Sequence, residues 1–205
     1  MNGFFEIVGT FLAECVSASL LMLVVENMIF SRAFGTSTAL VIIRKKNSLF
    51  LFGTVLTLIT VLSGIVTYFV EPYLRPLAHA VYYRPFVYTA IIGVVYVAAL
   101  IICGNLPHDL KMKLRPMIHI SAFNSVVLGT LLLAAGEELT FASSLGFGLG
   151  AGIGFTLATF FISVAYDYLY SAAIPRAFRG FPILLIYIGL LSLAFYGLVG
   201  HQLQY

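Results

Sequence analysis

Three polar side chains lie within or directly after the first apolar run of the chain. Glu14 interrupts the run, and Glu26 and Asn27 end it. A carboxylate is costly to place among hydrocarbon, so such groups are usually paired, protonated or part of an ion pathway. Two interpretations follow. The three residues form a proton- or cation-coupling site, or they are neutralised locally by hydrogen bonds to nearby serines and to freed backbone groups.

A second polar cluster interrupts an apolar run in the middle of the chain. It comprises His119, Ser121, Asn124 and Ser125. No two histidines have the spacing of metal ligands, so we expect no metal site. Cys15 and Cys103 both lie in apolar runs, where a thiol is most simply a small buried hydrophobic group.

Alternating glycines mark the segment GFGLGAGIG, where Gly146, Gly150 and Gly154 lie four residues apart. On a helix this spacing puts all three on one face and predicts close packing against a neighbouring helix. A thin helix beside a cofactor or an ion path is the functional alternative. No Lys-Ser or Lys-Thr pair follows, which excludes a phosphate-binding loop.

The composition is that of an integral membrane protein. Of the 205 residues, 61% are hydrophobic and 9% are charged, and the mean hydropathy is +1.04. This composition excludes a soluble enzyme, and the few scattered charges exclude a nucleic-acid binder. We therefore expect a single transmembrane domain over residues 1–205.

Hydropathy predicts an all-α protein with six transmembrane helices. The apolar stretches lie near 4–25, 48–70, 86–104, 117–136, 143–166 and 181–200. Nine lysines and arginines follow the odd-numbered spans, namely Arg32, Arg44, Lys45, Lys46, Lys111, Lys113, Arg115, Arg176 and Arg179. Only Arg75 and Arg84 follow the even-numbered spans. Because positive loops face the cytoplasm, both termini are expected outside. Tyrosines near span ends, Tyr88 among them, are expected in the interfacial aromatic belt.

The first and fourth spans are expected to be broken. A straight helix over residues 4–43 would be about 60 Å long, roughly twice the hydrocarbon thickness. The segment from Glu26 to Ile43 must therefore bend or unwind, and the fourth span carries the polar cluster. Breaks at corresponding places predict an inverted repeat of three plus three spans, with halves near 1–104 and 105–205.

Several of these segments occur together in one known family. They are VENMIFSRAFGTS (Val25 to Ser37), AFNSVVLG (Ala122 to Gly129), the glycine segment, and IPRAFRG with GLLSLAFYGLVG (Ile174 to Gly200). The chain resembles the small six-span subunits of the Rnf and sodium-pumping Nqr respiratory complexes, in particular the one called Rnf A or Nqr E. The most specific part of the motif is Pro175, Phe178, Arg179 and Gly180.

The resemblance implies a bacterial inner-membrane subunit that pairs with a homologous, oppositely oriented six-span partner. Such complexes pass electrons between ferredoxin or quinone and nicotinamide cofactors, and couple the transfer to ion movement. In the family, each of the two partners contributes two cysteines to a [2Fe-2S] cluster midway through the membrane.

Here the sequence departs from the family. Ser37 and Ser125 occupy the two positions where the resemblance implies cysteines. A hydroxyl is a harder and poorer iron ligand than a thiolate, so we expect the cluster to be lost and no cofactor in this chain. Gly35, Ser37, Asn124 and Ser125 would then line the former cluster pocket. The alternative is that Cys15 and Cys103 have taken over as cluster ligands. Each lies 22 residues upstream of its serine, about 33 Å along a straight helix, so without a sharp fold-back of the chain they cannot reach the pocket.

Two functional hypotheses follow. The first is a divergent, non-catalytic subunit of an Rnf/Nqr-type complex, with a scaffolding or gating role and the other complex subunits as partners. The second is a stand-alone small transporter or channel that reuses the inverted-repeat fold. Its site would lie at the two breaks, with Glu14 or Glu26 as the ion-coupling group.

Overall fold

The computed structural model describes residues 2–44, 48–137, 139–169 and 174–199, and every regular element in these ranges is helical. The helices are α1 (Asn2–Leu20), α2 (Thr36–Ile42), α3 (Leu49–Leu74), α4 (Ala80–Gly104), α5 (His108–Ala122), α6 (Ser125–Gly136), α7 (Phe141–Leu169) and α8 (Phe181–Val199). A π-helical turn, Leu21–Val25, extends α1, and a 3₁₀ turn, Arg176–Phe178, precedes α8.

Four of the described helical segments are long and apolar enough to cross a membrane. They are Phe4–Val25, Leu49–Leu74, Ala80–Gly104 and Phe141–Leu169. Helices α5 and α6 form a fifth candidate span, bent by 47° between them. Helix α8 is apolar but shorter. The prediction of an all-helical, multi-pass membrane protein is thereby confirmed.

The breaks in the helices differ in extent from the sequence prediction. In the first segment, regular helix stops at Val25 and resumes at Thr36, so the irregular stretch is shorter than the expected Glu26 to Ile43. In the fourth segment, the break is confined to Phe123 and Asn124, and α5 begins at His108 rather than near residue 117. The polar first half of α5 concealed this earlier start from a hydropathy search.

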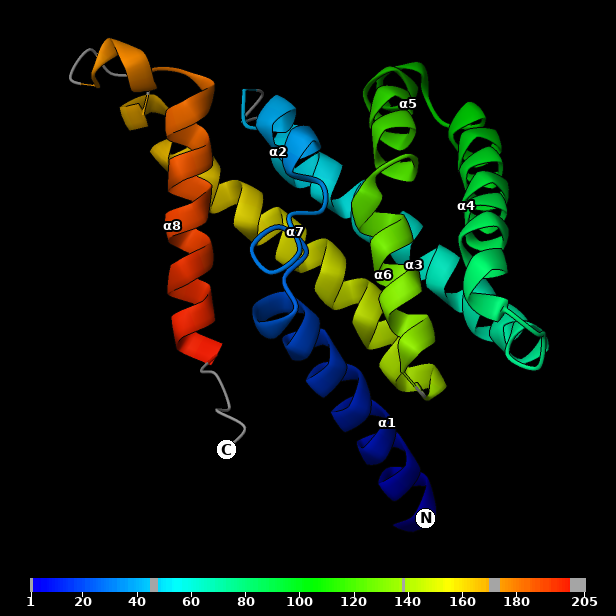
Figure 1. The fold of residues 1–205 in the computed structure, drawn as a ribbon. Helices are drawn as coiled ribbons and strands as arrows, with labels where there is room; N and C mark the ends of the chain where they lie inside the picture. Colours follow the sequence, from blue (N-terminus) through cyan, green and yellow to red (C-terminus); the bar gives the residue numbers. More distant parts are fainter. Residues whose placement is uncertain (1, 45–47, 138, 170–173, 200–205) are drawn as a thin grey trace, which may run out of the picture.

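Helix α7 runs through the centre of the molecule (Figure 1). Its glycines allow close contact with two neighbouring helices. A methyl group added at Gly146 or Gly150 would overlap backbone atoms of α1, and one added at Gly148 or Gly152 would press on α3. The prediction of close packing on the face of Gly146 and Gly150 is confirmed, and the alternate glycines form a second such face.

The ends of the molecule carry different charges. Helix α1 begins and α8 ends at the same end of the bundle (Figure 1). Helix α2, which ends just before Arg44, the basic first turns of α5 and the 3₁₀ turn at Arg176 lie at the opposite end. Lys45, Lys46 and His201 fall outside the described residues. Arg32 does not join the basic end, because it lies in the first break.

Candidate functional site

The two breaks meet each other inside the bundle. The backbone N–H of Gly35, directly before α2, donates a 2.9 Å hydrogen bond to Oγ of Ser125, the first residue of α6. Gly35 has a left-handed backbone with φ of +73°, and an added Cβ would lie 2.5 Å from Cγ2 of Val126 and 3.0 Å from Oδ1 of Asn124. Three of the four residues expected at the former cluster pocket are therefore neighbours.

Asn124 shapes the second break and leaves one polar group unused. Its Oδ1 accepts a 3.0 Å hydrogen bond from the N–H of Val126 and so caps α6. Its Nδ2 is buried and has no hydrogen-bond partner. A buried donor without a partner is rare in proteins and marks a place where a polar occupant would be stabilised.

Ser37 lies apart from this contact, one residue into α2. Both Ser37 and Ser125 are exposed on the surface of the chain. Ser37 lines an open groove with Arg44, Phe181 and Leu185. The fourth expected pocket residue thus faces outward, toward whatever covers this part of the bundle.

Asn27 organises the first break from within. The side chain is completely buried, and its Nδ2 donates to the carbonyl oxygens of Leu23 (2.9 Å) and Gly154 (3.1 Å). Its Oδ1 accepts from the N–H groups of Ile29 (3.1 Å) and Phe30 (3.2 Å). Asn27 therefore satisfies backbone groups that the end of the first helix leaves free, and ties the break to α7.

The two glutamates expected near Asn27 have separate partners. Oε2 of Glu26 accepts from Arg32 at 2.7 Å, and both side chains are partly exposed. Oε2 of Glu14 accepts a 2.6 Å hydrogen bond from Oγ1 of Thr140, directly before α7. Glu14 therefore lies beside the first residues of α7 and not beside the middle of that helix. The structure does not bring Glu14, Glu26 and Asn27 together, and an ion-coupling role for any of them stays a prediction.

The family motif forms the turn before α8. The N–H of Phe178 donates to the carbonyl oxygen of Pro175 at 2.9 Å, and Nε of Arg179 donates to that of Ile174 at 2.6 Å. Gly180 has a φ of +86°, a conformation that glycine adopts without strain. These residues fix the direction in which α8 starts.

A buried ionic cluster between α3 and α4 was not predicted from the sequence. Glu71 is 7% exposed, and its Oε1 lies 2.5 Å from Nη2 of Arg84 and 3.6 Å from Nε of Arg75. The hydroxyl of Tyr88 donates to Oε2. Tyr88 is completely buried, so its assignment to the aromatic belt is wrong. The available signals were the i,i+4 spacing of Glu71 with Arg75 and of Arg84 with Tyr88.

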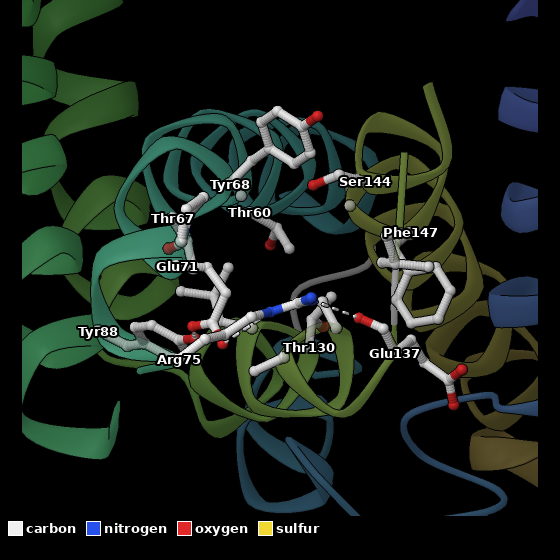
Figure 2. A pocket seen from close by; sticks show the side chains of 17 residues that line it. Thr60, Thr67, Tyr68, Glu71, Arg75, Tyr88, Thr130, Glu137, Ser144 and Phe147 are labelled. Atoms are coloured by element: carbon white, nitrogen blue, oxygen red, sulfur yellow. Dashed lines mark hydrogen bonds and ion pairs between the residues drawn. The ribbon is translucent and has the colours of Figure 1, made fainter. Parts of the chain in front are cut away.

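Beside this cluster lies a cavity of about 260 Å³ between α3, α6 and α7. Side chains of Glu71, Arg75 and Tyr88 form part of its wall (Figure 2). Four threonine and serine residues from the three helices also line this space: Thr60, Thr67, Thr130 and Ser144.

The residues at the meeting of the breaks do not fit an iron–sulfur cluster. Ser37 and Ser125 offer hydroxyls where the resemblance implies thiolates, and Oγ of Ser125 already accepts a hydrogen bond from the N–H of Gly35. Cys15 packs against Gly146, whereas Gly35 packs against Phe155, nine residues further along α7, or roughly 13 Å of helix. Cys103 is buried at the end of α4. Within the described ranges, no three His, Cys, Asp or Glu side chains gather at one point.

Comparisons with known proteins agree with this architecture. Residues 15–201 match the model of the family described as "Rnf-Nqr subunit, membrane protein". One relative, from Acetobacterium woodii, is named as a subunit of the Na(+)-translocating ferredoxin:NAD(+) oxidoreductase complex. It is 30% identical over 181 residues, covering 87% of this chain and 93% of that protein.

Two further relatives are named as subunits of ion-translocating oxidoreductase complexes. The protein from Vibrio vulnificus is 27% identical over 176 residues, covering 86% of this chain and 92% of the relative. The protein from Vibrio cholerae is 29% identical over 177 residues, covering 86% and 91%. The family match spans most of the chain and includes both breaks, the glycine segment and the turn before α8, and the chain therefore belongs to the Rnf-Nqr family of membrane subunits.

Proposed function

We propose that this chain is a subunit of an Rnf/Nqr-type ion-translocating electron-transport complex that scaffolds or gates the complex without an iron–sulfur cluster of its own. The observation that carries the proposal is the contact between the two breaks, Gly35 N–H to Ser125 Oγ. This contact occurs in a family member whose relatives are named as complex subunits. In this proposal, Ser37 and Ser125 stand at the two positions where the resemblance implies cysteines, and the contact of Ser125 with Gly35 keeps the frame around them.

The order and direction of the helices support an inverted repeat of three plus three spans. The first half would comprise α1 with α2, then α3 and α4; the second would comprise α5 with α6, then α7 and α8. In each half, the leading segment is the broken one. Helices α1 and α5 run in opposite directions along the bundle (Figure 1), as two inverted halves require.

An exposed patch at the breaks supports pairing with a homologous, oppositely oriented subunit. Phe34 and Phe123 are 37% and 70% exposed, and they flank the exposed Ser37 and Ser125. Large aromatic side chains beside hydroxyls, at the breaks of apolar helices, suit burial against another protein surface better than contact with lipid.

The distribution of charge supports a bacterial inner-membrane location with both termini outside. Arg44, the basic turns of α5 and the arginines near the 3₁₀ turn lie at one end, which the positive-inside rule assigns to the cytoplasm. The start of α1 and the end of α8 lie at the other end.

Purification from native membranes in mild detergent, followed by mass spectrometry of stoichiometric partners, tests membership in a complex. We expect a homologous six-span subunit together with flavin and iron–sulfur subunits. Recovery of the chain alone or as a homo-oligomer would contradict the proposal and favour a stand-alone transporter.

Iron analysis of the chain co-expressed with only its six-span partner tests the loss of the cluster. We expect this pair to hold no stoichiometric iron, and the Ser37→Cys/Ser125→Cys variant of the same pair to gain it. One [2Fe-2S] signal per wild-type pair in electron paramagnetic resonance, bound through this chain, would contradict the expectation.

A further inference from the structure

The cavity between α3, α6 and α7 has several oxygen-bearing side chains in a wall that is otherwise apolar (Figure 2). Its residues come from helix ends as well as from deep positions. Arg75 and Glu137 lie at the ends of α3 and α6, and Thr60 and Thr130 lie far inside the same helices. Thr130 is seven residues before Glu137, about 10 Å deeper along α6. The cavity therefore extends from one end of the bundle toward its middle.

The deepest hydroxyls can only accept hydrogen bonds from an occupant. Oγ1 of Thr60 donates its proton to the carbonyl oxygen of Leu56 at 2.8 Å, and Oγ1 of Thr130 donates to that of Val126 at 2.7 Å. A hydroxyl has one proton to donate and two lone pairs. With the protons committed to their own helices, both threonines offer lone pairs to the cavity, which suits a water molecule or a small cation.

Closer to the mouth of the cavity, Thr67 carries a polar group without a hydrogen-bond partner. Its side-chain oxygen is buried and has no hydrogen-bond partner, and the residue is 5% exposed. A buried hydroxyl without a protein partner indicates ordered water or an ion at that place. Ser144 adds a further hydroxyl, which points into the space from α7 (Figure 2).

The charged groups are concentrated at the mouth. The Arg75 side chain reaches across from α3, and its Nη2 donates a 3.2 Å hydrogen bond to the carbonyl oxygen of Glu137 (Figure 2). Glu71, beside it, is paired with Arg75 and Arg84. Thr60 lies eleven residues before Glu71, or roughly 16 Å along α3, so the arginine charges are remote from the deepest oxygens.

We propose that this cavity is a water-filled vestibule that admits a small monovalent cation to an acceptor-only floor at Thr60 and Thr130, with Arg75 as a strap across its mouth. The floor approaches the meeting of the breaks, because Thr130 is five residues beyond Ser125 on α6, or about 7 Å. The inference rests on the proposed function for its biological purpose, as a route for the translocated ion. The test below measures only the rate at which thiols in the cavity react. A negative result would therefore count against the vestibule and not against membership in a complex.

Silver-ion accessibility tests the vestibule directly. Single cysteines are introduced as Thr60→Cys, Thr130→Cys or Ser144→Cys in a Cys15→Ser/Cys103→Ala background, in native membrane vesicles that expose the Glu137 side. Ag⁺ has the charge of the proposed occupant and binds thiols tightly. Thiols that remain free are counted after denaturation by a gel shift with a polymer-linked maleimide. The matched control is Ile59→Cys, because Ile59 is an apolar residue that is buried on α3 and does not line the cavity.

We expect Ag⁺ to block the three cavity cysteines at least tenfold faster than the Ile59→Cys control. We also expect sodium or potassium nitrate to slow the reaction of Ser144→Cys relative to choline nitrate at equal ionic strength, and the two salts identify the preferred ion. Labelling of the cavity cysteines at the control rate would overturn the vestibule. Equal rates in all three salts would overturn the cation site.

A plugged variant checks the route without changing any oxygen. Gly64 lines the cavity, and a Cβ built there has its nearest neighbours at 3.9 and 4.0 Å, so the first carbon of a larger side chain is accommodated. We expect Gly64→Leu to slow Ag⁺ modification of Thr60→Cys at least tenfold, and Gly93→Leu, which faces open space on α4, to leave it unchanged. We expect Arg75→Ala to speed the reaction. Unchanged rates in both the Gly64 and Arg75 variants would contradict the proposed route.

Discussion

At the scale of single residues, the carboxylates of this chain differ in how deeply they are buried and in which partners they contact. Glu14 interrupts an apolar run and Glu26 ends it, yet each meets one nearby partner at a partly exposed position. Glu71 lies close to a span end and is far more deeply buried, with Arg84 and Tyr88 as partners. The cost of an isolated buried charge makes Glu71 the carboxylate whose partners matter most.

Glu71→Gln should destabilise the protein by about 3–5 kcal/mol, because it leaves Arg84 without its counter-charge in a partly buried place. The measurement is the free energy of unfolding in mixed micelles. Glu137→Gln is the control, since the Glu137 side chain is exposed and only its carbonyl accepts from Arg75. Equal stability of the two variants would show that the ionic cluster contributes nothing. A Glu71→Met/Arg84→Met double variant should recover part of the loss.

Gly35→Ala should also be costly, by roughly 1–3 kcal/mol, because alanine is strained at a φ of +73° and its Cβ would press on Val126. Gly189→Ala on α8 is the matched control, since nothing lies within 4 Å of a Cβ built there. Thermal unfolding of both variants in detergent checks this prediction. An unchanged midpoint for Gly35→Ala would mean that the two breaks do not need their close contact.

At the scale of elements, the glycines of α7 let the helices at the centre of the molecule pack closely against one another. Helix α7 presents Gly146 and Gly150 to α1, and Gly148 and Gly152 to α3. Lipid tails are as apolar as leucine, so membrane helices gain by close backbone approach rather than by hydrophobic burial. Alternation of glycine along a single helix gives such an approach to two neighbours at once.

Gly150→Ala tests this packing, because its methyl group would overlap the carbonyl oxygen of Ser19. We expect a loss of about 1–3 kcal/mol, as for overpacked cores. Gly93→Ala, with open space around its Cβ, should leave stability unchanged or raise it slightly. Unfolding in mixed micelles measures both variants, and a neutral Gly150→Ala would contradict a tight α1–α7 contact.

At the scale of the whole molecule, the asymmetry of charge between the two ends predicts the orientation in the membrane. The basic turns and the chain termini lie at opposite ends of the bundle (Figure 1). Two broken segments meet between these ends, and the oxygen-lined cavity approaches them from the end where α1 starts. This arrangement places a polar route on one side of the breaks.

Reporter fusions to the C-terminus check the orientation. Alkaline phosphatase fused after residue 205 should be active and green fluorescent protein fused there should be dark, because the positive-inside rule places this end outside the cytoplasm. Fusions after Asn105, at the basic end beside α5, serve as the reciprocal control. The reverse pattern at both positions would contradict the assigned topology.

The sequence by itself determined the class of protein, the family and the existence of the breaks. Composition requires a membrane environment, and the spacing of Gly146, Gly150 and Gly154 predicts a packed helix face, because both properties are local to the chain. The positions of Gly35 and Ser125 were also expected near one pocket, on the strength of the resemblance to known family members.

Tertiary structure alone decided which polar groups meet. The partners of Glu71 come from the same helix and the next one, yet their pairing depends on how α3 and α4 lie against each other. The cavity draws hydroxyls from three helices that are separate in the chain. Span-by-span hydropathy cannot anticipate either feature, because it averages over each helix and does not distinguish the face that meets a neighbour from the face that meets lipid.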